Sequence, residues 1–334
     1  MLRAMFSGVS GLKTHQIKMD VIGNNIANVN TPGFKAGYAN FKDVFYQTLT
    51  GSAEATALNG GINPSQVGYG TQLNSIELNF SNAGYMTSSS PTHCYINGEG
   101  FFVVQNSAGE YLYKRLGDFR FDGNGNLVDS SGNFVMGYPA ALADADGNPV
   151  TQVPLLDGSG NPVLDPDGNP VMTWSAPPVL TVVDNSNLQA LSPIKIPYYD
   201  KQTGEFSIND GSDPSKIAEI TNLQINADGK IIASVGNKIV ELGQICIAYI
   251  PNASALVQNG DSSYVARGNT GVITYHTADD GTAGGVISGA LESSNVDLAN
   301  EFTEMIITQR GFQANSRIIT VGDEMLQELV NLKR

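Results

Sequence analysis

The chain has 334 residues, with 18 basic and 32 acidic side chains and a formal net charge of −14. A chain this acidic repels phosphate backbones and anionic lipid surfaces, which disfavours nucleic acid and membrane surfaces as partners. The length suggests about two domains. Low charge (15%) and frequent glycine (37 residues) are common among extracellular and self-assembling proteins.

The pattern of apolar residues argues against two membrane-directed classes. No run approaches the ~18 apolar residues that a membrane span needs, so we expect no membrane insertion. The N-terminus is broken by Ser7-Gly8, Ser10-Gly11 and Lys13, and it lacks a compact apolar block and a small-residue cleavage site. We therefore expect no cleaved signal peptide. If the protein leaves the cell, it needs another route.

Few residues suit catalysis or metal binding. Cys94 and Cys246 lie in apolar, strand-like surroundings that favour buried thiols, although a mutual disulfide stays open. The pair His93-Cys94 has no second cluster at zinc-ligand spacing, and the Asp-rich turns do not fit the EF-hand pattern. No histidine accompanies a nucleophile motif, and carboxylate pairs for glycoside cleavage stay open only because acids are abundant. We predict no catalytic residues, metal, cofactor or enzyme activity.

The first 29 residues predict a helix with an apolar stripe of heptad period. Met5, Leu12, Met19 and Ile26 recur every seven residues, and Val9 lies in the intervening row. The pair Pro32-Gly33 ends this helix.

The middle of the chain predicts β structure. Short apolar runs such as Phe101–Val104 and Tyr111–Tyr113 alternate with turn residues. Asp122-Gly123 and Asn124-Gly125 are hairpin turn signals between such runs. A Pro-rich stretch at 139–197 predicts an excursion of short strands joined by Asx turns.

A second heptad stripe lies near the C-terminus. Residues 296–334 predict a helix that Asn295 or Asp297 can cap. The apolar stripe of this helix consists of Leu298, Met305, Phe312, Ile319 and Leu326, with Phe302 and Val330 in the companion row.

Neither helix can bury its stripe alone, which favours a coiled coil between the two termini over packing of each helix on its own domain. Residues 1–50 hold five basic and two acidic groups, whereas residues 291–334 hold seven acidic and four basic groups. These opposite charges would help select the partner and its orientation.

Three runs resemble signatures of the bacterial flagellar rod and hook protein family. They are Asn24–Lys35, Gly289–Leu298 and Thr308–Arg317, and Asn97–Phe102 adds to the similarity. The residues that carry the signature are Asn24, Asn25, Ala27, Asn28, Thr31, Gly33, Phe34, Lys35, Asn295, Val296, Asp297, Gln309 and Arg310. Within the family, 295–299, 326–332 and 136–139 are hook-like, and the distal rod branch is the alternative. An extracellular β adhesin and a polysaccharide-active enzyme are alternatives outside the family.

The resemblance implies a mixed α and β architecture. Residues 1–29 and 296–334 would pair as inner coiled-coil helices that line a channel. Residues 30–71 would form a linker arm. Residues 72–141 and 188–288 would form a central all-β domain, with 142–187 as a short inserted outer β segment.

The resemblance also implies a mechanical function. Identical subunits would polymerise head to tail into a hollow curved tube that acts as a universal joint, with the heptad residues of both helices at the self-assembly seam. Glycine-rich joints such as 281–285 would let the β layer slide. The implied partners are further copies of the chain, the rod and hook-filament junction proteins, the hook cap and the flagellar type III export machine. Phe41 and Phe45 resemble the family's export-gate pattern.

Overall fold

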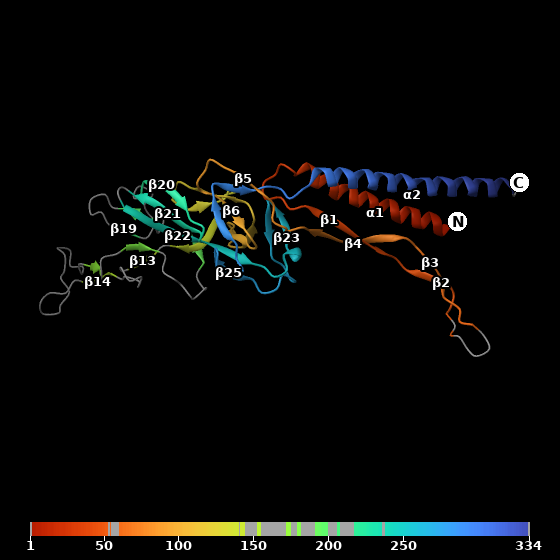
Figure 1. Ribbon diagram of the computed structural model, residues 1–334, viewed down its shortest axis with the longest axis horizontal. Coiled ribbons are helices and arrows are strands. Elements are labelled where there is room, and N and C mark those ends of the chain that lie inside the picture. Colours follow the sequence, from red (N-terminus) through yellow and green to blue (C-terminus); the bar gives the residue numbers. More distant parts are fainter. Residues whose placement is uncertain are drawn as a thin grey trace. The chain divides into compact units, whose positions relative to one another are not determined.

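The computed structural model describes residues 2–52, 54, 60–139, 141–143, 152–154, 172–174, 179–181, 191–199, 206–207, 217–235 and 238–332. The chain divides into two compact units. We call them the helical unit, which comprises Met1–Ser81 and Ser294–Arg334, and the β unit, Asn82–Ser293. The predicted order along the chain, with a helix at each end and a β-rich middle, is confirmed (Figure 1).

The helical unit contains helices α1 (Leu2–Ala27) and α2 (Leu298–Leu332), which lie side by side in Figure 1. After α1 the chain turns through hydrogen bonds such as Thr31 N to Asn28 O, and Gly33 adopts a φ of +71° that disfavours other residues. Asp297 is the N-cap of α2, because its carboxylate accepts hydrogen bonds from the backbone N–H groups of Ala299 and Asn300.

The segment predicted as a linker arm forms strands that pair within the helical unit. Strand β1 (Gly37–Asp43) pairs with β4 (Thr71–Leu78), and β2 (Tyr46–Thr50) pairs with β3 (Ser65–Gly68), both antiparallel. The Thr71 N–H donates to Ser10 Oγ on α1, at 3.3 Å. Residues 72–81 therefore belong with the helices, whereas we predicted the central β domain to begin at 72. The ladder with β1 holds them there.

The β unit is built on a sheet whose described part has twelve strands. Its central strands run in the order β10-β11-β12-β22-β7-β8-β24-β23, and β17, β20, β21 and β25 pair beside them. Their bounds are β7 Phe101–Gln105, β8 Tyr111–Lys114, β10 Arg120–Phe121, β11 Leu127–Val128, β12 Phe134–Pro139, β17 Ser192–Pro193, β20 Ile220–Ile225, β21 Lys230–Val235, β22 Lys238–Tyr249, β23 Val257–Gly260, β24 Ser263–Val265 and β25 Thr274–Thr277.

Smaller ladders complete the β unit. Strand β6 (His93–Asn97) pairs with β26 (Gly285–Ser288) and β9 (Gly117–Asp118), and β5 (Tyr85–Thr87) pairs with β27 (Ala290–Glu292). Strands β18 (Tyr198–Tyr199) and β19 (Phe206–Ser207) form another pair, and Ala253–Ala255 is a short 3-10 helix.

Alternating burial explains where the core of the β unit lies. In β21 the side chains of Ile231, Ala233 and Val235 are buried while their neighbours are half-buried, as a strand with one face on a core requires. Phe102 and Phe119 pack edge to face, with 5.0 Å between ring centroids.

Both cysteines lie in this unit as free, buried thiols, as the apolar surroundings predicted. Burial raises the pKa of Cys246 to about 12 and raises that of Cys94 further.

The hairpin turn predicted at Asp122–Gly125 is confirmed. The Asp122 carboxylate accepts hydrogen bonds from the N–H groups of Asn124 and Asn126, and Gly125 has a φ of +77°. Asp129 makes the equivalent bonds to Ser131 and Asn133 in the next turn. These acids therefore organise turns.

Gly284, in the glycine-rich segment 281–285, packs closely against Gly98. A Cβ on Gly284 would lie 2.6 Å from the Asn97 carbonyl oxygen, and a Cβ on Gly98 would lie 2.7 Å from the Cα of Gly284. The Gly284 N–H also donates to the Glu99 carbonyl. The segment 281–285, which we predicted as a sliding joint, is thus held at Gly284 against the end of β6. Only glycine permits the backbones to approach this closely.

The predicted insert 142–187 lies largely outside the described residues. Its described parts are antiparallel pairs, β13 (Ala141–Ala143) with β16 (Val179–Thr181) and β14 (Gln152–Pro154) with β15 (Met172–Trp174).

Candidate functional site

The two terminal helices meet along an antiparallel seam in the helical unit. Met5 faces Gly322, Gly8 and Gly11 face Asn315, and His15 faces Gly311. Further along, Lys18 pairs with Glu304 at 2.6 Å. At one end of the seam, the beginning of α1 lies against the last third of α2. At the other end, the end of α1 lies against the beginning of α2.

On α2, buried and half-buried residues follow a spacing of alternating three and four residues. One row of this face is the predicted stripe of Met305, Phe312, Ile319 and Leu326. The other row is Glu301, Thr308, Asn315 and Gly322, which are polar or small. The predicted companion Phe302 is 50% exposed, and Val330 and Leu298 are exposed too. Phe302 follows Glu301 by one residue, so it points about 100° away from the seam.

On α1, Met5, Leu12, Met19 and Ile26 are half-buried, as their position in the predicted stripe requires. Val9 is 53% exposed and does not belong to the seam. The adjacent Gly8 takes the place that we predicted for Val9, because α2 approaches that side of the helix.

Glycines allow the helices to approach closely. A Cβ on Gly11 would lie 2.6 Å from Asn315 Nδ2, and a Cβ on Gly311 would lie 2.7 Å from the His15 ring. Sequence analysis missed this role. The available signal was that glycine costs a helix interior about 1 kcal/mol relative to alanine, so its recurrence in two heptad helices indicates a packing requirement.

The polar groups of the seam are few and partly buried. Burial, followed by the nearby Lys18 charge, lowers the pKa of His15. Burial raises the pKa of Glu301, whose carboxylate accepts a hydrogen bond from Asn25 Nδ2 at 3.0 Å. The Lys18–Glu304 pair is the one ion pair found between the described residues of α1 and α2. The predicted charge complementarity is thus expressed in a single contact.

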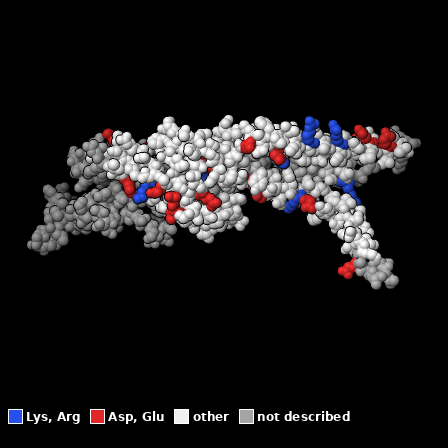
Figure 2. All heavy atoms as spheres, viewed as in Figure 1, with Lys and Arg blue, Asp and Glu red and all other residues white. Residues whose placement is uncertain are grey.

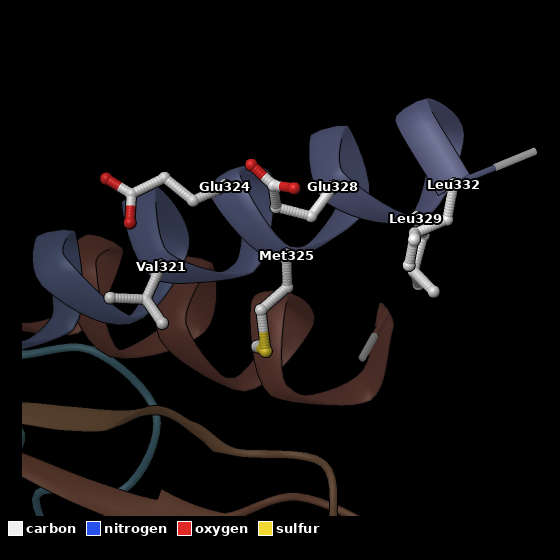
Figure 3. A pocket seen from close by; sticks show the side chains of 6 residues that line it. All are labelled: Val321, Glu324, Met325, Glu328, Leu329 and Leu332. Carbon is white, nitrogen blue, oxygen red and sulfur yellow. The ribbon is translucent and has the colours of Figure 1, made fainter. Parts of the chain in front are cut away.

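A second set of apolar side chains on these helices is exposed. It comprises Phe6, Val9, Leu298, Phe302, Ile306, Ile307, Ile318, Val321, Met325, Leu329, Val330 and Leu332. Val321, Met325, Leu329 and Leu332 line a groove with Glu324 and Glu328 at its rim (Figure 3). Leu329 and Leu332 lie on the part of α2 that extends beyond the beginning of α1. Figure 2 places acidic side chains near this end of the helical unit. Exposed apolar side chains that lie together and are rimmed by charged residues are typical of a protein–protein contact.

The signature residues gather where the helices join the β1–β4 ladder. Asn25 is buried, and its amide exchanges hydrogen bonds with the backbone of Gly37. Asn28 Nδ2 donates to the Asn24 carbonyl, and Thr31 Oγ1 donates to Asn28 Oδ1. The first signature therefore builds the turn that leads from α1 into β1.

The second signature joins this turn from the other end of the chain. Asn295 Oδ1 accepts a hydrogen bond from the Ala36 N–H at 2.7 Å, and Asn295 Nδ2 donates to the Asn79 carbonyl at 2.7 Å. Lys35, fully buried, donates from Nζ to the Ser81 carbonyl at 2.9 Å.

Further signature residues lie elsewhere in the described part or contribute through the backbone alone. Phe34 contributes its carbonyl, which accepts a hydrogen bond from Asn295 N, whereas Ala27 is the exposed last residue of α1 and Val296 is half-buried. Gln309 and Arg310 are exposed on α2.

The candidate export residues lie on the β1–β2 arm. Phe41 in β1 is paired with Leu73, and Phe45 is 84% exposed between β1 and β2.

Neither a membrane-spanning helix nor a metal-binding cluster was found in the described part. Its helices are too short or too polar to cross a bilayer, and its His, Cys, Asp and Glu side chains form no group of three or more suited to a metal ion.

The fold and the seam define a β-rich protein with paired terminal helices that expose an apolar surface. Three family models match it in order along the chain. The flagella basal body rod protein model matches residues 5–35. The flagellar hook protein FlgE/F/G D1 domain model matches 95–233, and the flagellar basal body rod FlgEFG protein C-terminal model matches 287–332.

Relatives match over their whole length. The chain is 35% identical to the flagellar basal-body rod protein FlgG of Bacillus subtilis over 336 positions, with 100% of both chains covered. It is 30% identical to the flagellar hook protein FlgE of Borreliella burgdorferi over 442 positions, again with 100% of both covered. With the hook protein FlgE of Salmonella typhimurium it shares 27% over 423 positions, covering 97% and 98%. The chain belongs to the flagellar hook and basal-body rod protein family.

Proposed function

We propose that this protein is a structural subunit of the flagellar hook. Subunits polymerise into a hollow, curved helical tube that serves as a universal joint and passes torque from the rod to the filament. The observation that carries this proposal is the exposed apolar surface on both terminal helices in a member of this family. In this proposal the surface makes head-to-tail contacts, and such contacts build a growing tube when the rotation between subunits does not close a ring.

The paired helices are proposed to form the inner coiled-coil layer around the channel. The alternating three- and four-residue spacing of the α2 seam supports a coiled coil. Because glycine, threonine and asparagine occupy much of that seam, the pair buries little apolar surface by itself. Contacts with neighbouring subunits would supply the remaining stability.

The β unit is proposed to form the layer outside the helices, with residues 142–187 as a nested outer insertion. The protein would work without catalysis or a cofactor. Its other partners would be the rod and hook-filament junction proteins and the hook cap, at an extracellular location.

Export is proposed to use the flagellar type III machine without cleavage of a signal peptide. The exposure of Phe45, and of Phe41 at the edge of the arm, leaves both side chains accessible for recognition. Replacing both by alanine should reduce secretion, whereas a Tyr46→Ala control on the same exposed arm should secrete normally. Unchanged secretion of the double variant would refute this role.

The distal rod is a second candidate, favoured by the alignments. The alignment with the Borreliella hook protein spans 442 positions against a chain of 334, so about a quarter of those positions have no counterpart here. The alignment with the Bacillus rod protein spans 336. A hook subunit with a small outer layer would have this length, and so would an enlarged rod subunit.

Electron microscopy of the concentrated full-length protein tests both candidates. Curved hollow tubes are the expected result, and straight tubes would assign the protein to the rod. A protein that stays monomeric at all concentrations and forms no tube on rod-bearing cells would overturn both.

A further inference from the structure

The chain crosses between the two units twice, at Ser81–Asn82 and at Ser293–Ser294. We propose that a buried Arg115–Glu292 pair clamps the two crossing segments together at the β unit, so that both segments carry mechanical load as one ribbon. In this proposal Arg115 holds the two crossing segments in position. The mechanical role rests on the proposed function, but the clamp itself can be tested without polymerisation.

The guanidinium of Arg115 reaches both crossing segments. It donates from Nη2 to Asn82 Oδ1, and Nη1 and Nη2 both donate to the Gly98 carbonyl at 2.9 Å. Its Nε lies 3.7 Å from Glu292 Oε2. Arg115 is 2% exposed and Glu292 is fully buried. Arg115 thus contacts the first residue of the β unit and the next-to-last one.

Glu292 closes the arrangement from the other side. Its Oε1 accepts a hydrogen bond from the Ala83 N–H at 3.3 Å. The Ser293 N–H donates to the Gly84 carbonyl at 2.8 Å, and Tyr95 OH donates to the Ala83 carbonyl at 3.0 Å. Residues 82–84 and 292–293 are therefore joined by backbone and side-chain bonds around one buried ion pair.

The β5–β27 ladder that joins the two crossing segments is short. Strands β5 and β27 share three residue pairs, and an isolated pair of short strands is marginal in water. Removing one partner of a buried ion pair leaves the other charge uncompensated, so the pair makes separation of the segments costly. The ring of Phe101 lies 5.6 Å from Arg115 Cζ and supports the guanidinium from one side.

An equivalent fastening exists at the helical unit. Lys35 holds the Ser81 carbonyl, while Asn295 bonds to both Asn79 and Ala36. Each crossing segment is thus tied to the other immediately before it leaves its unit. A single connection could swivel like a flexible linker, whereas two tied connections resist twisting.

The Lys114–Asp129 pair provides a matched control. It is also an ion pair of fully buried side chains in the β unit, at 2.9 Å, and its hydrogen bonds run to Asp261, Ser131 and Asn133, away from the crossing segments. An Asp129→Asn variant should therefore weaken the β unit without loosening the crossings. Glu292→Gln serves as a second clamp variant that keeps the side-chain shape.

The test uses the full chain with spin labels on Asn74→Cys in the helical unit and Ser107→Cys in the β unit, both exposed positions. The native cysteines are buried. Pulsed electron spin resonance measures the distribution of distances between the labels. We expect Arg115→Met or Glu292→Gln to broaden the distribution at least twofold, and Asp129→Asn to leave its width unchanged.

An unchanged width in both clamp variants, or equal broadening by Asp129→Asn, would overturn the clamp. The measurement is made on the monomer at low concentration, so a failure of the hook proposal would leave it intact. If the hook proposal holds, cells carrying Glu292→Gln should assemble tubes but swim more slowly than wild type in viscous medium, whereas Asp129→Asn cells with equal tube content should not.

Discussion

Glycines in α1 and α2 occupy two different environments, and the difference can be measured. Gly11 and Gly311 face side chains of the opposite helix, whereas a Cβ on Gly23 would meet no atom within 4 Å. Alanine at either seam position has to displace Asn315 or His15. Alanine at Gly23 only removes the cost of a glycine in a helix.

We predict that Gly311→Ala destabilises the helix pair by about 1–3 kcal/mol, the usual cost of overpacking. Gly23→Ala should stabilise it by up to about 1 kcal/mol, because it improves helix propensity without a clash. Urea unfolding of assembled tubes, followed by helical circular dichroism, measures both. Stabilisation by both variants would contradict close packing at the seam.

His15 makes the helix pair sensitive to acid. Burial lowers its pKa in the folded protein, so folding favours the neutral ring. The contribution of His15 is fully present above the unfolded pKa of about 6.5 and is lost as the pH falls below that value and through the lower folded pKa. Glu301 acts in the opposite direction, because its raised pKa favours its protonated form on folding.

We therefore expect the midpoint of helix unfolding to fall between pH 7.5 and pH 5.5 in the wild type and to change less in His15→Gln. The measurement is a pH series of thermal melts at constant salt. If acidification raised the unfolding midpoint of the wild type by the same amount as that of the variant, His15 would not be the source of the acid sensitivity.

At the scale of elements, the terminal helices depend on assembly more than the sheet does. Their seam alternates Met305, Phe312, Ile319 and Leu326 with small or polar residues. The β unit instead has a continuous apolar core that includes Phe102, Ile231 and Ile245. Helices gain most of their stability from packing of an apolar face, and here much of that face has no neighbour within the subunit.

We predict that amides of α1 and α2 exchange within seconds to minutes in the free monomer, while β7, β21 and β22 stay protected. In polymerised protein the helical amides should become protected too. Hydrogen exchange with mass spectrometry distinguishes the two states. Equal protection of helices and sheet in the monomer would refute an assembly-dependent helical unit.

At the scale of the whole molecule, the exposed apolar groove of α2 is the surface that polymerisation would cover. Met325 lines this groove and also a second one, which it forms with Met5, Ile318, Val321 and Gly322. Val272 in the β unit is 80% exposed and lies apart from the helices in sequence and unit. Replacing each of these two side chains by lysine therefore compares the effect of the same added charge at a proposed contact and at an exposed position elsewhere.

We expect Met325→Lys to abolish tube formation or to raise the protein concentration it needs at least tenfold, because a buried charge would lie in the contact. Val272→Lys should polymerise like the wild type. Sedimentation of tubes over a concentration series provides the measurement. Normal assembly of Met325→Lys would exclude this groove from the subunit contact.

Local and periodic signals made much of the protein predictable from its sequence. The heptad spacing predicted both terminal helices, and Asp297 marked where α2 begins. The predicted stop at Pro32-Gly33 came late, because α1 already ends at Ala27. Asp122–Gly125 predicted its hairpin, because turn geometry depends on neighbouring residues. The signature at Asn24–Lys35 and Thr308–Arg317 indicated the family.

The tertiary structure decided which side of each helix faces the other and where each segment belongs. Periodicity could not show whether Phe302 or Glu301 belongs to the companion row. The two side chains point about 100° apart around α2, and the glycines of α1 select which of these sides faces the partner helix. The acidic, glycine-rich composition could not reveal that Lys35 reaches Ser81 or that Arg115 joins Asn82 and Glu292. Those contacts unite residues far apart in the chain, and only folding brings them together.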